Sequence, residues 1–187
     1  MTEQELLLGL RKGEESAYKE LVNQFQDKVF NTALGLIQHH TEAEDIAQEV
    51  FIQVFRSILQ FKGDSLLSTW IYRIAVTKSL GHLRSKKRKK RFGFLSSLFG
   101  ENNMPLHEPK DFNHPGVLQE NKEDAALLFK MIGQLPENQR SAFILNKVEE
   151  LSYREIAAIL NTTEPAVDSL LQRAKQNLRK KLNEWPI

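Results

Sequence analysis

Residues Ser152 to Leu182 read SYREIAAILNTTEPAVDSLLQRAKQNLRKKL and carry the strongest local signal for the fold. Ser152 and Glu155 have the spacing of a capping box, which predicts that a helix begins there. Asn161 tolerates the left-handed backbone of a tight turn, and Pro165 fits only the first turn of a following helix. The pattern therefore predicts a helix-turn-helix, whose second helix can enter the major groove of duplex DNA.

The second helix of this unit has a polar outer face. It carries Asp168, Ser169, Gln172 and Arg173, whose side chains can reach base edges or phosphates. Asp168 would repel phosphate, although a carboxylate can accept a hydrogen bond from a cytosine amino group. The alternative is a plain helical hairpin with a solvated face.

The first half of the chain also shows helical periodicity. Apolar residues recur every three to four positions in 6–10, 21–37 and 46–59, which predicts three amphipathic helices. Thr2 with Glu5 and Thr41 with Glu44 have capping-box spacing, so the first and third of these helices are expected to begin there. Gly63 and Asp64 end the third helix, and a fourth is predicted from about Ser68.

The fourth helix, STWIYRIAVTKSLGHLRSKKRKKR, Ser68 to Arg91, ends in seven basic residues out of eight. Trp70, Arg73, Thr77 and Arg84 share one stripe, and rings beside cations suit single-stranded nucleic acid. Three other interpretations remain. Trp70 and Tyr72 could be core residues, the basic run could be a nonspecific tail, or residues 86–99 could bind anionic lipid.

Composition excludes several classes of function. The 187 residues include no cysteine, which rules out disulfides, iron–sulfur clusters and thiolate metal sites. There is no phosphate-binding glycine loop, zinc-protease motif or nucleophile motif, so we expect no enzyme, cofactor, metal or small-molecule substrate. The adjacent His39 and His40 are expected to form a solvated helix end. Without an evident secretory signal or membrane span, a cytoplasmic protein is expected.

Residues 92–120 lack sustained periodicity and contain several glycines and prolines, which predicts a flexible linker. The chain is thus expected to be all-α, with one small helical domain at 1–91 and another at 121–187. The net charge of +2 hides a basic block between two mildly acidic halves.

Several segments together resemble a known family. AEDIAQEVFIQVFRSILQF, from Ala43, and STWIYRIA, from Ser68, precede the helix-turn-helix in the order found in extracytoplasmic-function sigma factors of the sigma-70 superfamily. The resemblance covers everything except the linker. It implies a region 2 bundle and a region 4 helix-turn-helix. It also implies a factor that binds core RNA polymerase and directs promoter-specific initiation.

The resemblance also implies site residues. Minus-ten DNA would contact Phe61, Trp70, Arg73, Thr77, Arg84, Lys86, Lys87 and Arg88, with the loop 61–67 capturing a flipped-out base. The minus-thirty-five element would be read by Arg154, Asp168, Ser169, Gln172 and Arg173. Asp45, Gln48 and Glu49 would bind the beta-prime clamp helices, and region 4 would contact the beta flap. Many relatives carry asparagine in place of Thr77 and several carry a basic residue in place of Asp168, which leaves base preference open.

A partner and an arrangement follow from the same resemblance. Such factors usually have an anti-sigma factor, which can hold them at the inner membrane rather than at the nucleoid. A flexible linker spans only about 30 Å, whereas two turns of duplex cover about 70 Å, so the polymerase must draw the domains apart. Unbound, the domains are expected to sit together or be held by an inhibitor. The rivals are a helix-turn-helix regulator that acts without polymerase and a membrane-surface protein.

Overall fold

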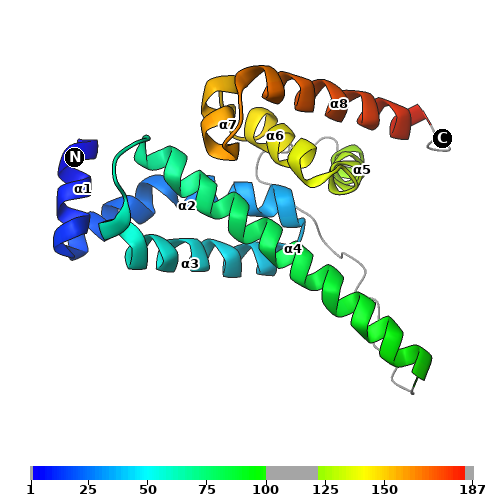
Figure 1. Cartoon of the computed structure of the whole chain (residues 1–187), viewed down its shortest axis with the longest axis horizontal. Coiled ribbons are helices and arrows are strands. Elements are labelled where there is room, and N and C mark those ends of the chain that lie inside the picture. Colours follow the sequence, from blue (N-terminus) through cyan, green and yellow to red (C-terminus); the bar gives the residue numbers. More distant parts are fainter. Residues whose placement is uncertain (1, 100–121, 184–187) are drawn as a thin grey trace.

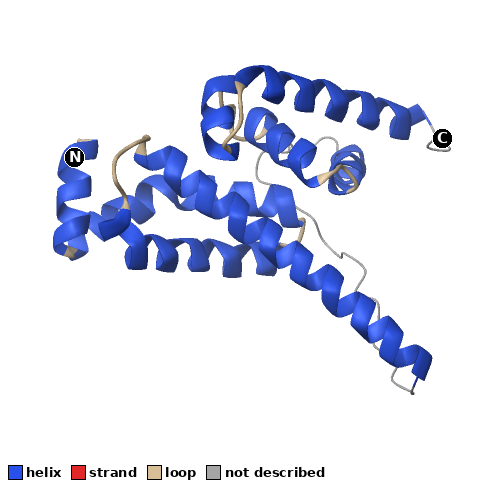
Figure 2. Cartoon of the chain, viewed as in Figure 1, coloured by secondary structure: helices blue, strands red, loops and turns tan. Residues whose placement is uncertain are grey.

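The computed structural model describes residues 2–99 and 122–183, with side chains over 2–91 and 127–183. Over these residues it contains helices and loops and no strand, which confirms the all-α prediction (Figure 2). In order along the chain the elements are α1 Glu3–Lys12, α2 Glu15–Ile37, α3 His40–Ser57, a 3-10 turn η1 Ile58–Gln60, α4 Leu67–Phe99, α5 Lys122–Gly133, α6 Glu137–Lys147, α7 Tyr153–Leu160 and α8 Glu164–Asn183. Helices α1–α4 form one bundle and α5–α8 a second (Figure 1).

Two of the three predicted capping boxes are present. Thr2 caps α1 and Ser152 caps α7, each exchanging hydrogen bonds with the glutamate three residues later. The prediction at Thr41 is wrong, because His39 is the cap of α3, two residues earlier than predicted. After α2 ends, Gln38 turns the chain at φ 59°, and His39 is then the first extended residue. Its Nδ1 accepts a hydrogen bond from the backbone N–H of Glu42 at 3.3 Å.

Helix α4 is longer than predicted. It has 33 residues and runs through the basic segment to Phe99, so its backbone is helical where a linker was expected from residue 92. Lysine and arginine are good helix formers, and the first proline after this segment is Pro105, so nothing in the basic run stops the helix. Figure 1 shows α4 crossing the first bundle and projecting beyond it. The rest of the predicted linker, 100–120, lies outside the described residues.

The core of the first bundle is built where α1, α2, α3 and α4 meet. Leu21 of α2, Val50 of α3 and Ile71 of α4 are at most 1% exposed within it. Each such side chain stabilises the fold by about 1.5–3 kcal/mol through the apolar surface that it removes from water. This core buries one face of α4. The other faces of the helix remain available for contacts outside the first bundle.

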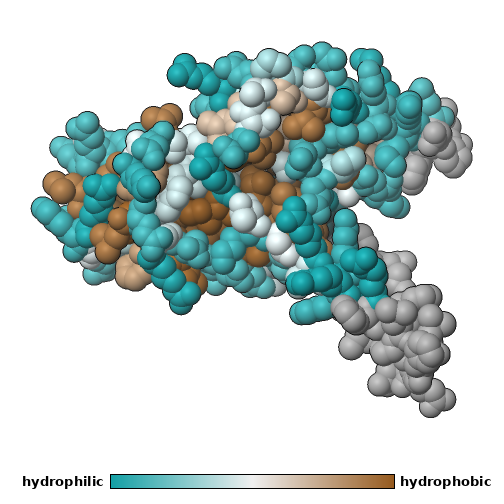
Figure 3. Space-filling view, in the orientation of Figure 1, coloured by the Kyte–Doolittle hydropathy of each residue, from teal (hydrophilic) through white to brown (hydrophobic). Residues whose placement is uncertain are grey.

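The core of the second bundle is not closed on itself. Leu36 of α2, together with Tyr72, Val76 and Leu80 of α4, packs into the same cluster as Phe129, Ile144 and Ile156. In the view of Figure 3, apolar side chains gather in the middle of the molecule, and hydrophilic ones cover α8 and the outer part of α4. The two bundles therefore share a core, in agreement with the expectation that they sit together.

Candidate nucleic-acid interface

A groove lies between α3 and α4. It has a volume of about 620 Å³, and α4 lines it with Trp70, Arg73 and Thr77, three of the residues predicted to contact minus-ten DNA. Their spacing of three and four residues puts them on one side of the helix. Gly81 continues this side, and nothing lies within 4 Å of the position that a side chain would occupy there. The groove is therefore open toward solvent along the predicted stripe.

Trp70 forms the aromatic part of this groove and rests on Phe61. The two ring centroids lie 5.0 Å apart, and the planes are inclined by 35°. Trp70 is half-buried, so part of its ring remains accessible. Phe61 is only 6% exposed and belongs to the core of the first bundle. In this structure its ring supports Trp70 from the core side, and a direct contact of Phe61 with a base stays a prediction.

Two cations of the predicted stripe are bound to the second bundle. A guanidinium nitrogen of Arg73 donates a hydrogen bond to the carbonyl oxygen of Ala158, in α7, at 2.6 Å. Arg84 donates two hydrogen bonds to Glu137 at the start of α6, at 2.9 and 2.7 Å. These bonds lower the pKa of Glu137 and outweigh its partial burial. Both guanidinium groups thus have partners inside the protein.

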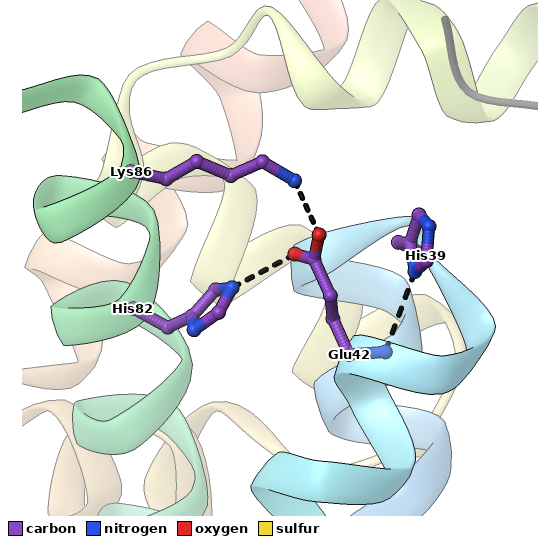
Figure 4. Close-up of polar contacts among 4 residues, drawn as sticks. All are labelled: His39, Glu42, His82 and Lys86. Carbon is purple, nitrogen blue, oxygen red and sulfur yellow. Dashed lines mark hydrogen bonds and ion pairs between the residues drawn. The ribbon is translucent and has the colours of Figure 1, made fainter. Parts of the chain in front are cut away.

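Lys86, another predicted DNA contact, is also paired. Figure 4 shows Lys86 and His82 of α4 on the two carboxylate oxygens of Glu42, while the backbone N–H of Glu42 points to His39. The His82 Nε2 lies 2.8 Å from Glu42. Burial opposes ionisation of Glu42, but the hydrogen bonds from Lys86 and His82 hold its pKa below the ordinary value. The cluster ties α4 to the start of α3.

The outer part of α4 carries the exposed cations. Lys87 and Arg88 are exposed, and with Arg84, Arg91 and Glu137 they line a second open cleft of about 570 Å³ between α4 and α6. Glu137 is the one carboxylate among the charged side chains that line this cleft. The side chains here present a net positive surface that is continuous with the groove, as an electrostatic track along a phosphate backbone requires.

The helix-turn-helix forms as predicted. Asn161 adopts φ 52° and ψ 54° at the end of α7, and α8 begins at Glu164 with Pro165 in its first turn. Among the predicted reading residues, Arg154, Ser169, Gln172 and Arg173 are exposed and Asp168 is half-buried. The Asp168 carboxylate accepts a hydrogen bond from the Gln172 amide at 2.8 Å. This contact orients the Gln172 amide on the outer face of α8.

The exposed outer face of α3 extends beyond the three residues that the sequence predicted as a binding surface. Asp45, Gln48 and Glu49 are exposed, and Glu49 lies 3.2 Å from Lys78. The same face continues through large apolar side chains that are unusually exposed: Ile52 at 49%, Phe55 at 60% and Leu59 at 74%. Their steps of three and four residues from Glu49 could have revealed them, because exposed apolar residues in a row commonly mark an interaction surface.

No helix in the part of the chain that the structure describes is long and apolar enough to cross a membrane. Among residues 2–99 and 122–183, no group of three or more histidines or acids is placed to hold a metal ion.

Comparisons with protein families and curated proteins agree with one another. The family model for sigma-70 region 2 matches residues 21–89, and that for sigma-70 region 4 matches residues 125–178. The RNA polymerase sigma-H factor of Pseudomonas aeruginosa is 32% identical over 180 residues, which cover 96% of this chain and 93% of that protein. The ECF RNA polymerase sigma-E factor of Escherichia coli K12 is 31% identical over 182 residues, covering 97% and 95%.

Two solved structures share the fold. CnrH in complex with the cytosolic domain of CnrY matches with a TM-score of 0.67 and 18% identity, over 97% of both chains. The sigma factor RpoE in complex with the anti-sigma factor NepR, from Bartonella quintana, matches with a TM-score of 0.65 and 22% identity, over 89% of this chain and 96% of that one.

Proposed function

The chain belongs to the extracytoplasmic-function sigma factors of the sigma-70 family, and on that premise we propose how its two bundles share promoter recognition. It directs core RNA polymerase to promoters, and its family consists of initiation factors that are not enzymes. The second bundle reads the minus-thirty-five element as duplex through α8. The first bundle captures the melted minus-ten strand along α4, and the polymerase supplies the chemistry.

The observation that carries this proposal is the presence of two different surfaces in one chain. The groove beside Trp70 offers part of a ring with cations further along the same helix, which is the arrangement that unpaired bases require. The exposed face of α8 offers polar side chains on a helix-turn-helix, the arrangement that a major groove requires. A regulator that binds only duplex has use for the second surface alone.

The partners follow from the family and from α3. The exposed row of Ile52, Phe55 and Leu59, next to the acidic Asp45 and Glu49, suits a helical partner with both basic and apolar side chains. We assign this row to the beta-prime clamp helices of core polymerase, with promoter DNA and an anti-sigma factor as further partners. A protein with these partners works in the cytoplasm, where polymerase and promoters are.

The decisive experiment is in vitro transcription with core polymerase on a promoter library. We expect the purified chain to direct initiation from a subset of templates that share two sequence elements separated by a fixed spacer. Duplex binding without any polymerase-dependent transcript would contradict the proposal and favour the helix-turn-helix regulator. Flotation with anionic liposomes tests the alternative of a membrane-surface protein, because only such a protein should rise with the vesicles.

Replacing Trp70 with alanine should weaken capture of the melted strand. One stacked base contributes about 1–3 kcal/mol, so open complexes should form about 5- to 150-fold less readily. The measurement is permanganate footprinting of the minus-ten region on a template taken from the library. Because Trp70 also packs on Phe61, Trp70→Phe serves as the control that keeps a ring on that support. Normal melting by the alanine variant would remove Trp70 from the DNA surface.

Neutralising the basic run should change the salt dependence of binding. If Lys87, Arg88, Lys89 and Lys90 all contact phosphate, their replacement by glutamine should flatten the plot of log affinity against log salt by about 3 for single-stranded DNA. Fluorescence anisotropy over a salt series measures this slope. The control replaces the same number of exposed cations on other faces, namely Lys12, Lys19, Lys28 and Arg56. Equal slopes for both variants would assign the run to another role.

A further inference from the structure

The buried side of α8 decides which of its side chains are presented together. Figure 1 shows α8 along the outer edge of the second bundle. Val167 is 0% and Leu171 is 1% exposed, and both pack into the core. Asp168 and Gln172 come directly after these two residues and are four residues apart, so they lie one above the other on one side of the helix. The core therefore fixes this pair in place.

A hydrogen bond joins the two side chains. The Nε2 of Gln172 donates to the Oδ2 of Asp168 at 2.8 Å. An ionised carboxylate has no hydrogen to donate, so only the nitrogen end of the amide can face it. The Gln172 amide is thus held in one of its two orientations, and its Oε1 is the end that remains available to a partner.

The stability of α8 does not account for this pair. Glutamine and aspartate four residues apart stabilise an isolated helix only slightly, and α8 is already held by its buried side. A carboxylate on a helix that approaches DNA also repels phosphate, which works against binding. The pair is better explained by the hydrogen-bonding groups that it presents to the base edges.

The Asp168 carboxylate offers acceptors alone. In the major groove, cytosine presents an N4 amino group and adenine an N6 amino group, whereas guanine and thymine present oxygen acceptors in those places. An acceptor that faces an acceptor is repelled. Adenine also carries the N7 acceptor beside its amino group, and cytosine has no such neighbour. A carboxylate at this position therefore favours cytosine on the strand that it faces.

The Gln172 amide offers a different combination. After one N–H is given to Asp168, it keeps Oε1 as an acceptor and its second N–H as a donor. Adenine has the complementary pair, the N6 amino group and the N7 acceptor, and glutamine commonly binds both. Residues three to four positions apart on a recognition helix contact successive bases. The two side chains are therefore spaced to reach neighbouring base pairs.

We propose that Asp168 and Gln172 read the minus-thirty-five element as one unit. Asp168 accepts a hydrogen bond from a cytosine, and it also holds the Gln172 amide in the orientation that selects an adenine in the neighbouring base pair. This inference rests on the proposed function. Because Asp168 has both roles, its removal affects two base pairs, whereas removal of Gln172 affects one.

The test is transcription by core polymerase with the full chain, on active templates whose minus-thirty-five region is randomised and marked by a transcribed barcode. We expect the wild type to select cytosine and adenine in neighbouring base pairs. Asp168→Ala should lower the preference for cytosine by about 5- to 150-fold. It should also lower the neighbouring preference for adenine by about twofold or more, since the two side chains are coupled. Gln172→Ala should lower the preference for adenine alone.

Two variants of the same helix serve as controls. Glu164→Ala removes another exposed acid, and Gln176→Ala removes the same amide one turn further along. Neither should change the preferences at the two base pairs. Alanine has the highest helix propensity, so α8 should persist in all four variants, and circular dichroism checks this.

Three results would overturn the proposal. The first is an element without neighbouring cytosine and adenine. The second is an Asp168→Ala variant that keeps both preferences, as a purely structural pair would. The third is an Asp168→Ala variant that loses the cytosine preference and keeps the adenine preference in full, because the two residues would then act separately.

The wild-type arm separates this inference from the function on which it rests. A wild-type chain that yields no polymerase-dependent transcript from any template contradicts the proposed function. A wild-type chain that directs initiation, while Asp168→Ala selects the same bases as the wild type, leaves the proposed function intact and contradicts only the two-residue reader.

Discussion

Exchanging both Phe55 and Leu59 for alanine is expected to weaken binding to core RNA polymerase by several hundredfold, or about 3–4 kcal/mol. The two side chains are 60% and 74% exposed in the free chain, although both are large and apolar. A partner that covers them removes this surface from water, and anchors of this kind often contribute about 2 kcal/mol each. The affinity of labelled protein for core enzyme, measured by anisotropy, gives the result.

The matched control is Leu8→Ala, which shortens an apolar side chain that is 56% exposed on α1, away from the surfaces assigned to polymerase. It should bind core enzyme as the wild type does. Reversing the charges of Asp45 and Glu49 with lysine should give a smaller loss that shrinks at high salt, since exposed charges are screened. If the double alanine variant binds normally while its circular dichroism is unchanged, polymerase docks elsewhere on the chain.

Glu149→Gln is expected to raise the free energy of unfolding at pH 8 by up to about 3 kcal/mol and to have little effect near pH 4. Burial raises the pKa of Glu149 to about 7 from its ordinary 4.5, although the Tyr72 hydrogen bond and Lys28 oppose the shift. A raised pKa favours the protonated group in the folded chain. Protonated Glu149 therefore makes its full contribution to the stability of the folded chain below pH 4.5. This contribution is lost as the pH rises to 7, and it stays lost above pH 7.

Urea unfolding of wild type and variant from pH 4 to 8 measures this difference. The carboxyls of Glu42, Glu137 and Glu155 have lowered pKa values and act in the opposite direction, below about pH 4.5, but they are common to both proteins and cancel. Glu150→Gln makes the same chemical change at the neighbouring residue, which is exposed. Its free energy of unfolding should follow that of the wild type across this pH range. Parallel stability curves for wild type and Glu149→Gln would disprove the assignment.

Local patterns in the sequence predicted the helices and their ends well, but they did not predict the long-range packing. The cap at Ser152, the turn at Asn161 and the start of α8 depend on neighbours a few residues away, so spacing alone revealed them. His39 displaced Thr41 as a cap because the bend at Gln38 decides where the next extended residue falls. No periodicity encodes a bend of this kind.

The predicted DNA-contacting residues of α4 also show that local patterns do not reveal long-range partners. Helical spacing placed Trp70, Arg73 and Thr77 on one side of α4, and the groove there agrees. The partners of Arg73, Arg84 and Lys86 lie 85, 53 and 44 residues away, in positions that only the tertiary structure brings near. Phe61 is buried for a similar reason, because the core of the first bundle accepts its ring.

The length of α4 has a mechanical consequence. At 33 residues the helix is about 50 Å long. Lys86 is the last residue of α4 described here with a bond to α3, and the part of the helix beyond it is about 20 Å long. A rod of this length acts as a lever, so tilting its packed half by a few degrees would displace the far tip by several ångströms. Whatever rotates the first bundle against polymerase would thereby steer the point from which the chain departs toward duplex DNA.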